Sequence, residues 1–119
     1  MKLLIVDDSS IMRMAISKGL GSEQIEIVGQ AGDGVSALDL FKQTDPDFVT
    51  MDITMPHLDG LSCLEEMIKL KSSVKILVIT ALTNDGLPLQ ALKKGARGFL
   101  NKPFTPEKLR DAFSKMINP

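Results

Sequence analysis

Apolar residues along the chain gather in five short runs, and each run is followed by a stretch in which apolar residues recur at helical spacing. Continuous apolar runs of this length are typical of strands buried on both faces of a sheet. The second run instead alternates, with Ile25, Ile27 and Gly29 on one face, which indicates a strand at the sheet edge. The predicted strands are 3–6, 25–31, 48–51, 75–79 and 98–101.

The stretches between these runs have the three- and four-residue spacing of amphipathic helices. In the first of them we expect Ile11, Met14 and Ala15 to face the core. The fourth helix has Gly86 and Pro88 in its first turn, so we expect it to be the least stable helix. The remaining predicted core positions in the helices are Leu20, Val35, Leu38, Phe41, Leu61, Leu64, Met67, Ile68, Leu89, Leu92, Ala96, Leu109, Ala112, Phe113, Met116 and Ile117.

Strands that alternate with helices favour an α/β fold, because parallel strands need crossover connections and these are right-handed. The prediction is a five-stranded parallel sheet with helices on both faces. Since the second strand has an edge pattern, the strand order should be 2-1-3-4-5, which is flavodoxin-like. A chain of 119 residues has the length of one globular domain, so we assign 1–119 to a single unit.

Composition argues against several classes of function. The formal net charge is −1, and the basic residues Lys93, Lys94 and Arg97 are not interleaved with aromatic side chains, so no nucleic-acid surface is expected. The run from Leu3 to Val6 is too short for a signal peptide or a membrane span. The single cysteine, Cys63, cannot form an internal disulfide and suits a reducing compartment. We therefore expect a cytoplasmic protein without a membrane partner.

Polar residues follow the ends of four predicted strands. In the predicted order these strands share one edge, which brings together Asp7, Asp8, Asp52, Thr80 and Lys102. Crowded carboxylates repel one another unless a cation lies among them, and oxygen ligands with open positions favour Mg²⁺. A lysine and a hydroxyl beside such an ion could hold a phosphoryl group, and an Asp carboxylate can accept one as an acyl phosphate.

These residues belong to a set of short motifs that is more specific than any one of them. The motifs are Asp7-Asp8 after the first strand, Met51-Asp52 followed by Met55-Pro56 and Asp59-Gly60, Thr80-Ala81, and Lys102-Pro103-Phe104. As a set, they resemble the receiver domain of two-component response regulators over nearly the full chain, and in particular the stand-alone receivers of chemotaxis. The resemblance implies one receiver domain, 1–119, that is phosphorylated on Asp52 by the phosphohistidine of a histidine kinase.

The resemblance also implies the roles of the surrounding residues. Asp8 would bind Mg²⁺ directly and Asp7 through water, with Asp52 and the backbone carbonyl of Thr54 as further ligands. In addition, Thr80 would donate a hydrogen bond to the phosphoryl group and Lys102 would pair with it, and the peptide before Pro103 would be cis. The protein would assist its own phosphorylation and dephosphorylation without being an enzyme in the ordinary sense.

Two further expectations concern switching and lifetime. In the family, the hydroxyl residue at the position of Thr80 moves toward the phosphate, and an aromatic residue of the fifth strand follows it. In this sequence that aromatic residue is Phe99, at a position where tyrosine is frequent in the family. The output surface would be the fourth helix, fifth strand and fifth helix, with an effector such as a flagellar motor switch component as partner of a monomeric protein. Thr54 and Leu82 would tune water access to the acyl phosphate. Neither is an acid or an amide able to orient a water, and Leu82 should shield the bond, so self-dephosphorylation should be slow.

Other functions fit parts of the sequence. The segment 32–37 matches a dinucleotide-binding fingerprint, but Asp33 would place a negative charge inside a pyrophosphate loop. A Mg²⁺-dependent aspartyl phosphohydrolase with Asp52 as nucleophile is the alternative of another class, although Thr54 stands where a general acid is common. The chain could also be a phosphate sink, or a receiver detached from a larger regulator such as a chemotaxis methylesterase.

Overall fold

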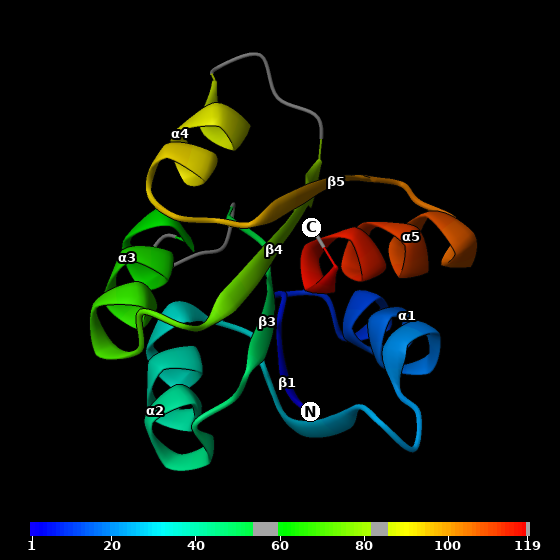
Figure 1. The fold of residues 1–119 in the computed structure, drawn as a ribbon, viewed down its shortest axis with the longest axis horizontal. Helices are drawn as coiled ribbons and strands as arrows, with labels where there is room; N and C mark the ends of the chain where they lie inside the picture. The colour runs from blue at the N-terminus through cyan, green and yellow to red at the C-terminus, as the bar shows by residue number, and fades with distance from the viewer. Residues whose placement is uncertain (54–59, 82–85, 119) are drawn as a thin grey trace.

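Within the described residues, five parallel strands form one sheet in the order β2-β1-β3-β4-β5, as the pattern predicted (Figure 1). The computed structural model describes residues 1–53, 60–81 and 86–118. The strands are β1 (Lys2–Val6), β2 (Glu26–Ala31), β3 (Phe48–Met51), β4 (Lys75–Ala81) and β5 (Gly98–Lys102). The helices are α1 (Ser10–Leu20), α2 (Gly34–Thr44), α3 (Gly60–Leu70), α4 (Leu87–Lys93) and α5 (Pro106–Ile117). None of the helices in these segments is long and apolar enough to cross a membrane.

The helices cover both faces of the sheet, with α1 and α5 on one side and α2, α3 and α4 on the other (Figure 1). Successive residues of β1 point to opposite faces, so Leu3 and Ile5 pack with α1 and α5, whereas Leu4 and Val6 pack with the other layer. Both faces are buried, which is why the central strands are apolar without alternation. The predicted α/β class and strand order are therefore confirmed.

The edge strand β2 departs from the predicted alternation. Ile27 pairs with Leu3, but Gly29 pairs with Leu4, so one extra residue of β2 forms a bulge between them. As a result, Ile27 packs with the α1 and α5 layer, whereas Gly29 lies against Leu40 of α2 on the opposite face. The prediction that Ile27 and Gly29 share a face was wrong, because a bulge adds a residue to one strand and shifts the period of two.

The buried stripe of α1 also differs from the predicted one. Ile11 and Met14 are 78% and 56% exposed and Ala15 is exposed, whereas Ile16 and Leu20 are buried. The sequence offers two apolar stripes on this helix, and only one of them can face the sheet. The stripe that includes Ile16 and Leu20 packs with the α5 side of the core, which leaves the other one in solvent.

The predicted core residues of α2 and α4 were partly wrong, because an alanine is buried where a larger residue was expected. In α2, Val35 is 59% exposed and Ala37 is fully buried; in α4, Leu89 is 57% exposed and Ala91 is fully buried. Leu92 is also 43% exposed. An alanine at the contact lets a helix axis approach the sheet closely, so larger side chains flank the contact. The other predicted core positions are confirmed as buried or half-buried.

Candidate functional site

Four strand ends meet at the carboxyl edge of the sheet and carry the predicted polar residues. Asp7 directly follows β1, Asp52 directly follows β3, Thr80 lies near the end of β4 and Lys102 ends β5. The backbone N–H groups of Asp7 and Asp52 each donate a 3.0 Å hydrogen bond to a carbonyl of the adjacent strand. Both acids therefore stand on backbone that the sheet holds in place.

Three carboxylates gather at this edge. Asp7, Asp8 and Asp52 each offer an oxygen atom, and these oxygens lie within 4.8 Å of one another. Asp7 and Asp52 are 1% and 3% exposed, whereas Asp8 faces solvent. Two buried anions and an open side suit a hard divalent cation that keeps part of its water shell, so this donor set fits Mg²⁺.

Lys102 links two of the acids. Its Nζ lies 2.7 Å from Asp7 Oδ2 and 3.1 Å from Asp52 Oδ2, and its side chain is 18% exposed. The Thr80 hydroxyl donates to Asp52 Oδ1 at 3.1 Å. Both oxygens of Asp52 therefore have a partner of the kind that would also hold an attached phosphoryl group.

Burial and the charges of the site shift the pKa of Asp7 and Lys102. Burial raises the pKa of Asp7 above its ordinary value, although hydrogen bonds from Lys102 and Ser9 and the charge of Lys102 oppose the shift. Burial alone would lower the pKa of Lys102, but its hydrogen bond to Asp7 and the charges of Asp52 and Asp7 outweigh burial and raise it. The site thus holds Lys102 as a cation, whereas burial disfavours the Asp7 anion.

Local structure explains the position of Asp7. The Ser9 N–H donates to Asp7 Oδ1 at 2.9 Å, and the Ser9 hydroxyl accepts from the N–H of Met12 and caps α1. Arg13, further along the same helix, donates from Nη1 to the Asp7 carbonyl at 2.6 Å. Arg13 was not among the predicted site residues; its signal in the sequence is an arginine in the helix that directly follows an Asp pair.

Gly60 allows the strand that carries Asp52 to lie against α3. A Cβ atom on Gly60 would lie 2.3 Å from Ile53 Cα and 2.6 Å from the Asp52 carbonyl oxygen. Backbone atoms cannot give way as a flexible side chain can, so only glycine fits here. The Asp59-Gly60 motif marked this residue, but the sequence did not reveal which backbone it approaches.

The remaining predicted positions have different outcomes. The Lys102–Pro103 peptide is cis, as the resemblance implied. Phe99 in β5 is half-buried against the core on the α2, α3 and α4 side. Asp33 accepts from the Ser36 N–H at 2.8 Å and caps α2, which follows the edge strand, so the dinucleotide interpretation of 32–37 has no support. Thr54 and Leu82 lie outside the described residues.

Comparison with known proteins identifies this arrangement. The model of the response regulator receiver domain matches residues 3–114. The chain belongs to the response regulator receiver domain family. It is 36% identical to the chemotaxis protein CheY of Thermotoga maritima over 115 residues, which cover 97% of this chain and 96% of that protein. It is also 36% identical to CheY of Bacillus subtilis, with 98% of each chain covered.

A solved structure agrees with these relatives. The chain matches the crystal structure of the CheX-CheY-BeF3-Mg²⁺ complex from Borrelia burgdorferi with a TM-score of 0.91 and 32% identity, over 98% of this chain and 88% of that one. The protein is thus a CheY-like receiver of two-component signal transduction. Receivers of this kind are signalling proteins, and the cluster of Asp7, Asp8 and Asp52 is the acidic pocket that fits their Mg²⁺.

Proposed function

We propose that the protein is a single receiver domain, 1–119, whose Asp52 accepts the phosphoryl group of a histidine kinase. The observation that carries this proposal is the set of contacts to Asp52, with Thr80 on one carboxylate oxygen and Lys102 on the other. An Asp52 oxygen forms the new bond to phosphorus as the phosphorus–nitrogen bond of phosphohistidine breaks, and the departing imidazole nitrogen takes up a proton. The product is an aspartyl phosphate.

The other site residues position and neutralise charge, which is most of what phosphoryl transfer needs from a protein. Lys102 pairs with one phosphoryl oxygen and the Thr80 hydroxyl donates to another. A Mg²⁺ ion bound by Asp7, Asp8 and Asp52, together with the Thr54 carbonyl, would neutralise a third. The same residues support both formation and hydrolysis of the acyl phosphate, so the protein is a phosphoacceptor that assists its own turnover and not an enzyme acting on other substrates.

The test is labelling by a small phosphodonor. Acetyl phosphate should label the intact protein in the presence of Mg²⁺, and the label should be stable in acid and labile in alkali. Labelling should vanish in Asp52→Asn and fall strongly in Asp8→Asn, whereas Asp39→Asn, which removes an exposed carboxylate on α2, should leave it unchanged. Label that persists in Asp52→Asn would overturn the proposal. Steady hydrolysis of a phosphomonoester such as p-nitrophenyl phosphate would instead favour the phosphohydrolase alternative.

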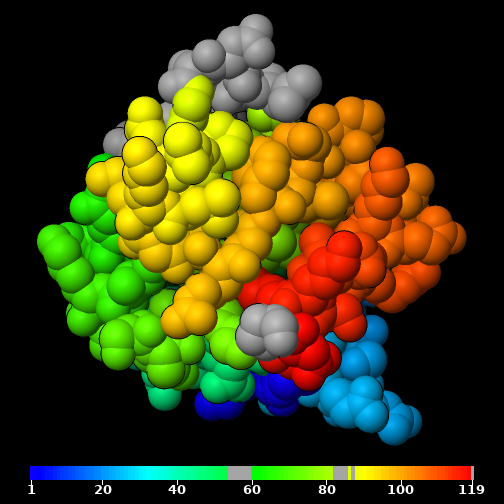
Figure 2. All heavy atoms as spheres, turned by 45° about the horizontal axis from the view of Figure 1, so that its top comes forward, coloured from blue at the N-terminus to red at the C-terminus, as the bar shows by residue number. Residues whose placement is uncertain are grey.

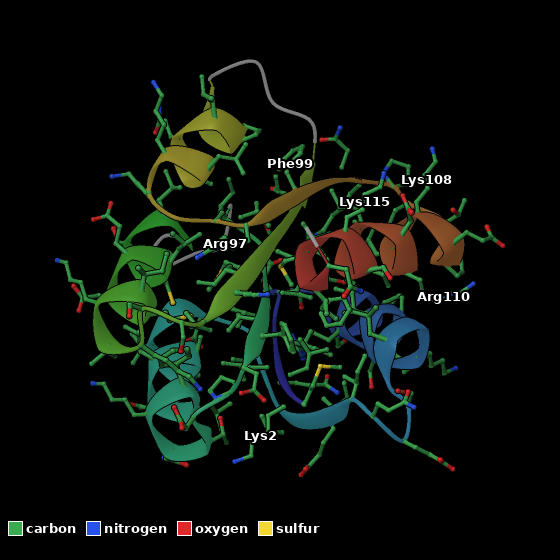
Figure 3. All side chains as sticks on the ribbon, viewed as in Figure 1. Lys2, Arg97, Phe99, Lys108, Arg110 and Lys115 are labelled. Carbon is green, nitrogen blue, oxygen red and sulfur yellow. The ribbon has the colours of Figure 1, made fainter. Side chains whose placement is uncertain are left out.

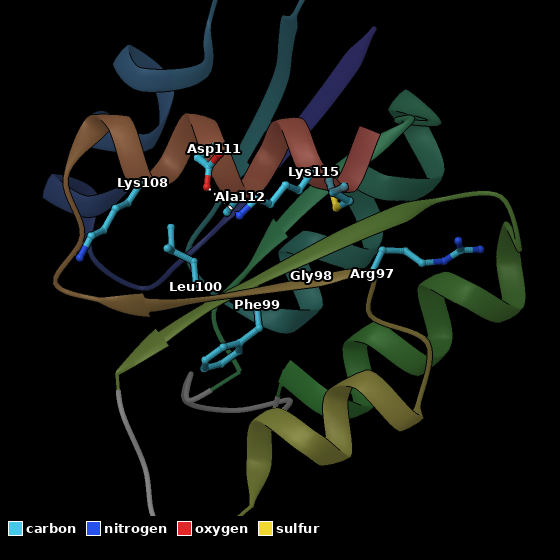
Figure 4. Close-up of a pocket in the computed structure, with 9 residues that line it drawn as sticks. Arg97, Gly98, Phe99, Leu100, Lys108, Asp111, Ala112 and Lys115 are labelled. Carbon is cyan, nitrogen blue, oxygen red and sulfur yellow. Dashed lines mark ion pairs between the residues drawn. The ribbon is translucent and has the colours of Figure 1, made fainter. Parts of the chain in front are cut away.

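The proposed output surface is the face formed by α4, β5 and α5. Figure 2 shows these three elements side by side, in yellow, orange and red. A groove of about 330 Å³ lies along β5 and α5 and is lined by Arg97, Lys108 and Lys115, with Asp111 as its one acid. Figure 3 and Figure 4 show Lys108 and Arg97 toward opposite ends of the groove, with Lys115 between them. A groove with this excess of positive charge suits an acidic segment of an effector, such as a flagellar motor switch component in a cytoplasmic chemotaxis pathway.

Phe99 connects this surface to the site. Figure 4 shows its ring on the side of β5 that faces α4, opposite Leu100 and α5. Thr80 and Phe99 lie on neighbouring strands, since Val78 in β4 pairs with Phe99. A shift of the Thr80 hydroxyl from Asp52 to a phosphoryl oxygen would leave space behind it for the Phe99 ring, which links phosphorylation to the shape of the α4, β5 and α5 surface.

The lifetime of the phosphorylated state depends on positions beyond the described residues. The proposal is that Leu82 and Thr54 tune water access to the aspartyl phosphate and keep its hydrolysis slow, because neither side chain is an acid or an amide and Leu82 shields the bond. Leu82→Ala and Thr54→Asn should each accelerate loss of label after the donor is removed. Unchanged decay in both variants would contradict this assignment and leave the role of Asp52 untouched.

A further inference from the structure

The side chain of Arg13 has a use that the phosphoacceptor mechanism does not explain. Arg13 lies on α1 and is half-buried, and its Nη1 donates a 2.6 Å hydrogen bond to the backbone carbonyl of Asp7. In the described part of the chain, no carboxylate forms an ion pair with it. A charged donor directed at a neutral peptide oxygen, beside three carboxylates, indicates that the position of this peptide matters.

Gly32 provides the space for this contact. It directly follows β2, and a Cβ atom there would lie 3.2 Å from Arg13 Nη1 and 3.9 Å from the Asp7 carbonyl oxygen. Among the described glycines, positive φ angles occur at Gly86 and Gly95 and not at Gly32. The backbone conformation therefore does not demand a glycine here, but a side chain at this position would press on the guanidinium, which would have to shift by a few tenths of an ångström.

The held carbonyl belongs to the peptide that joins Asp7 to Asp8. The side chain of Asp7 is fixed independently, by the Ser9 N–H on one oxygen and Lys102 on the other. The side chain of Asp8 is exposed, and no hydrogen bond or ion pair holds it within the residues that the structure describes. Among these residues only the backbone places Asp8: it sets the point from which the side chain departs toward the site, and Arg13 holds the peptide at that point.

We infer that Arg13 is a positioning residue of the metal site: by holding the Asp7–Asp8 peptide in the space left by Gly32, it keeps the Asp8 carboxylate in place for a divalent cation. This role rests on the proposed metal site. This role predicts a change in cation affinity opposite to the one expected from charge alone. Removal of a positive charge near a cation site should by charge alone tighten cation binding. Loss of positioning should weaken it instead.

The experiment measures divalent cation affinity directly, with Mn²⁺ by electron paramagnetic resonance and Mg²⁺ by calorimetry, in the full chain without phosphodonor. Arg13→Met and Arg13→Lys should each weaken binding by about tenfold, the usual scale for residues that orient metal ligands. Gly32→Val, which displaces the guanidinium and keeps its charge, should do the same. The double variant Arg13→Met with Gly32→Val should be no weaker than either single variant, because both remove one contact.

The controls separate positioning from folding and from the metal site itself. Circular dichroism and thermal unfolding in EDTA establish that each variant is folded, and Asp8→Asn gives the affinity expected when the ligand is lost. Unchanged or tighter cation binding in folded Arg13→Met and Gly32→Val would overturn the role of Arg13 and leave the metal site standing. A wild-type protein that binds neither ion would overturn the metal site, and the role of Arg13 with it.

Discussion

Replacing Lys102 with methionine should destabilise the metal-free protein through charge. Lys102 contacts two of three clustered carboxylates, at 2.7 Å and 3.1 Å, so its loss removes a positive charge that offsets their mutual repulsion. Removal of one partner of a buried ion pair costs about 3–5 kcal/mol. Lys102 is 18% exposed and Asp8 faces solvent, so we expect the lower end, about 3 kcal/mol, or about 12 °C in Tm for a domain of this size.

The dependence on pH and metal identifies charge as the cause. The pKa of Asp7 is already raised in the folded protein, mainly by burial. Such a carboxyl binds protons more tightly when folded, so it favours the folded state at low pH, and this contribution is lost as pH rises through the raised pKa. Without Lys102 the shift should grow. The stability difference between variant and wild type should therefore shrink at acidic pH, and it should shrink at neutral pH when Mg²⁺ is added.

The assay is thermal unfolding followed by circular dichroism, in EDTA and in excess Mg²⁺, near neutral and at acidic pH. Lys115→Met is the matched control, because it removes a 76% exposed lysine from its pair with Asp111 and should change stability by less than about 1 kcal/mol. A Lys102→Met protein as stable as wild type in EDTA would refute the reasoning. An equal loss in all four conditions would assign the effect to lost packing of the lysine stem.

Three further predictions follow from single contacts. Gly60→Ala should lower the free energy of unfolding in urea by about 3 kcal/mol and impair labelling of Asp52, because the new Cβ would meet backbone at 2.3 Å. Gly19→Ala is the control, because its new Cβ meets only the end of a leucine side chain. A comparable loss of stability in Gly19→Ala would contradict the argument. The Thr50 hydroxyl is buried and, among the described residues, lacks a hydrogen-bond partner. Thr50→Val should therefore stabilise the protein by about 1 kcal/mol. A loss of stability in the same urea titration would show that the hydroxyl is solvated or hydrogen-bonded. Ile11 is 78% exposed on the first turn of α1, beside the site, which suits a docking contact with the kinase. Ile11→Ser should slow phosphorylation by a histidine kinase about tenfold, the scale of one apolar contact, and leave labelling by acetyl phosphate unchanged. Equal rates of the variant and the wild type with the kinase would exclude a docking role for this residue.

The order of elements and the position of the acids followed from the sequence alone. A central parallel strand must be apolar on both faces and must end where the chain leaves the sheet, so a run such as Leu3 to Val6 marks both the strand and the place of Asp7. Parallel strands end at one edge, so the strand order was sufficient to place Asp7, Asp52 and Thr80 there. These relations depend on chain connectivity and on period, which a sequence records directly.

Only the tertiary structure decided which apolar surface each helix buries and which side chains meet. Ile11 and Ile16 are equally apolar, and the choice between their stripes depends on how the whole surface of α1 fits against the sheet and α5. The bulge in β2, the approach of Gly60 to Ile53 and the bond from Arg13 to the Asp7 carbonyl likewise depend on distances between segments that are separate along the chain. Such distances are set by the summed packing of the core, which no local pattern contains.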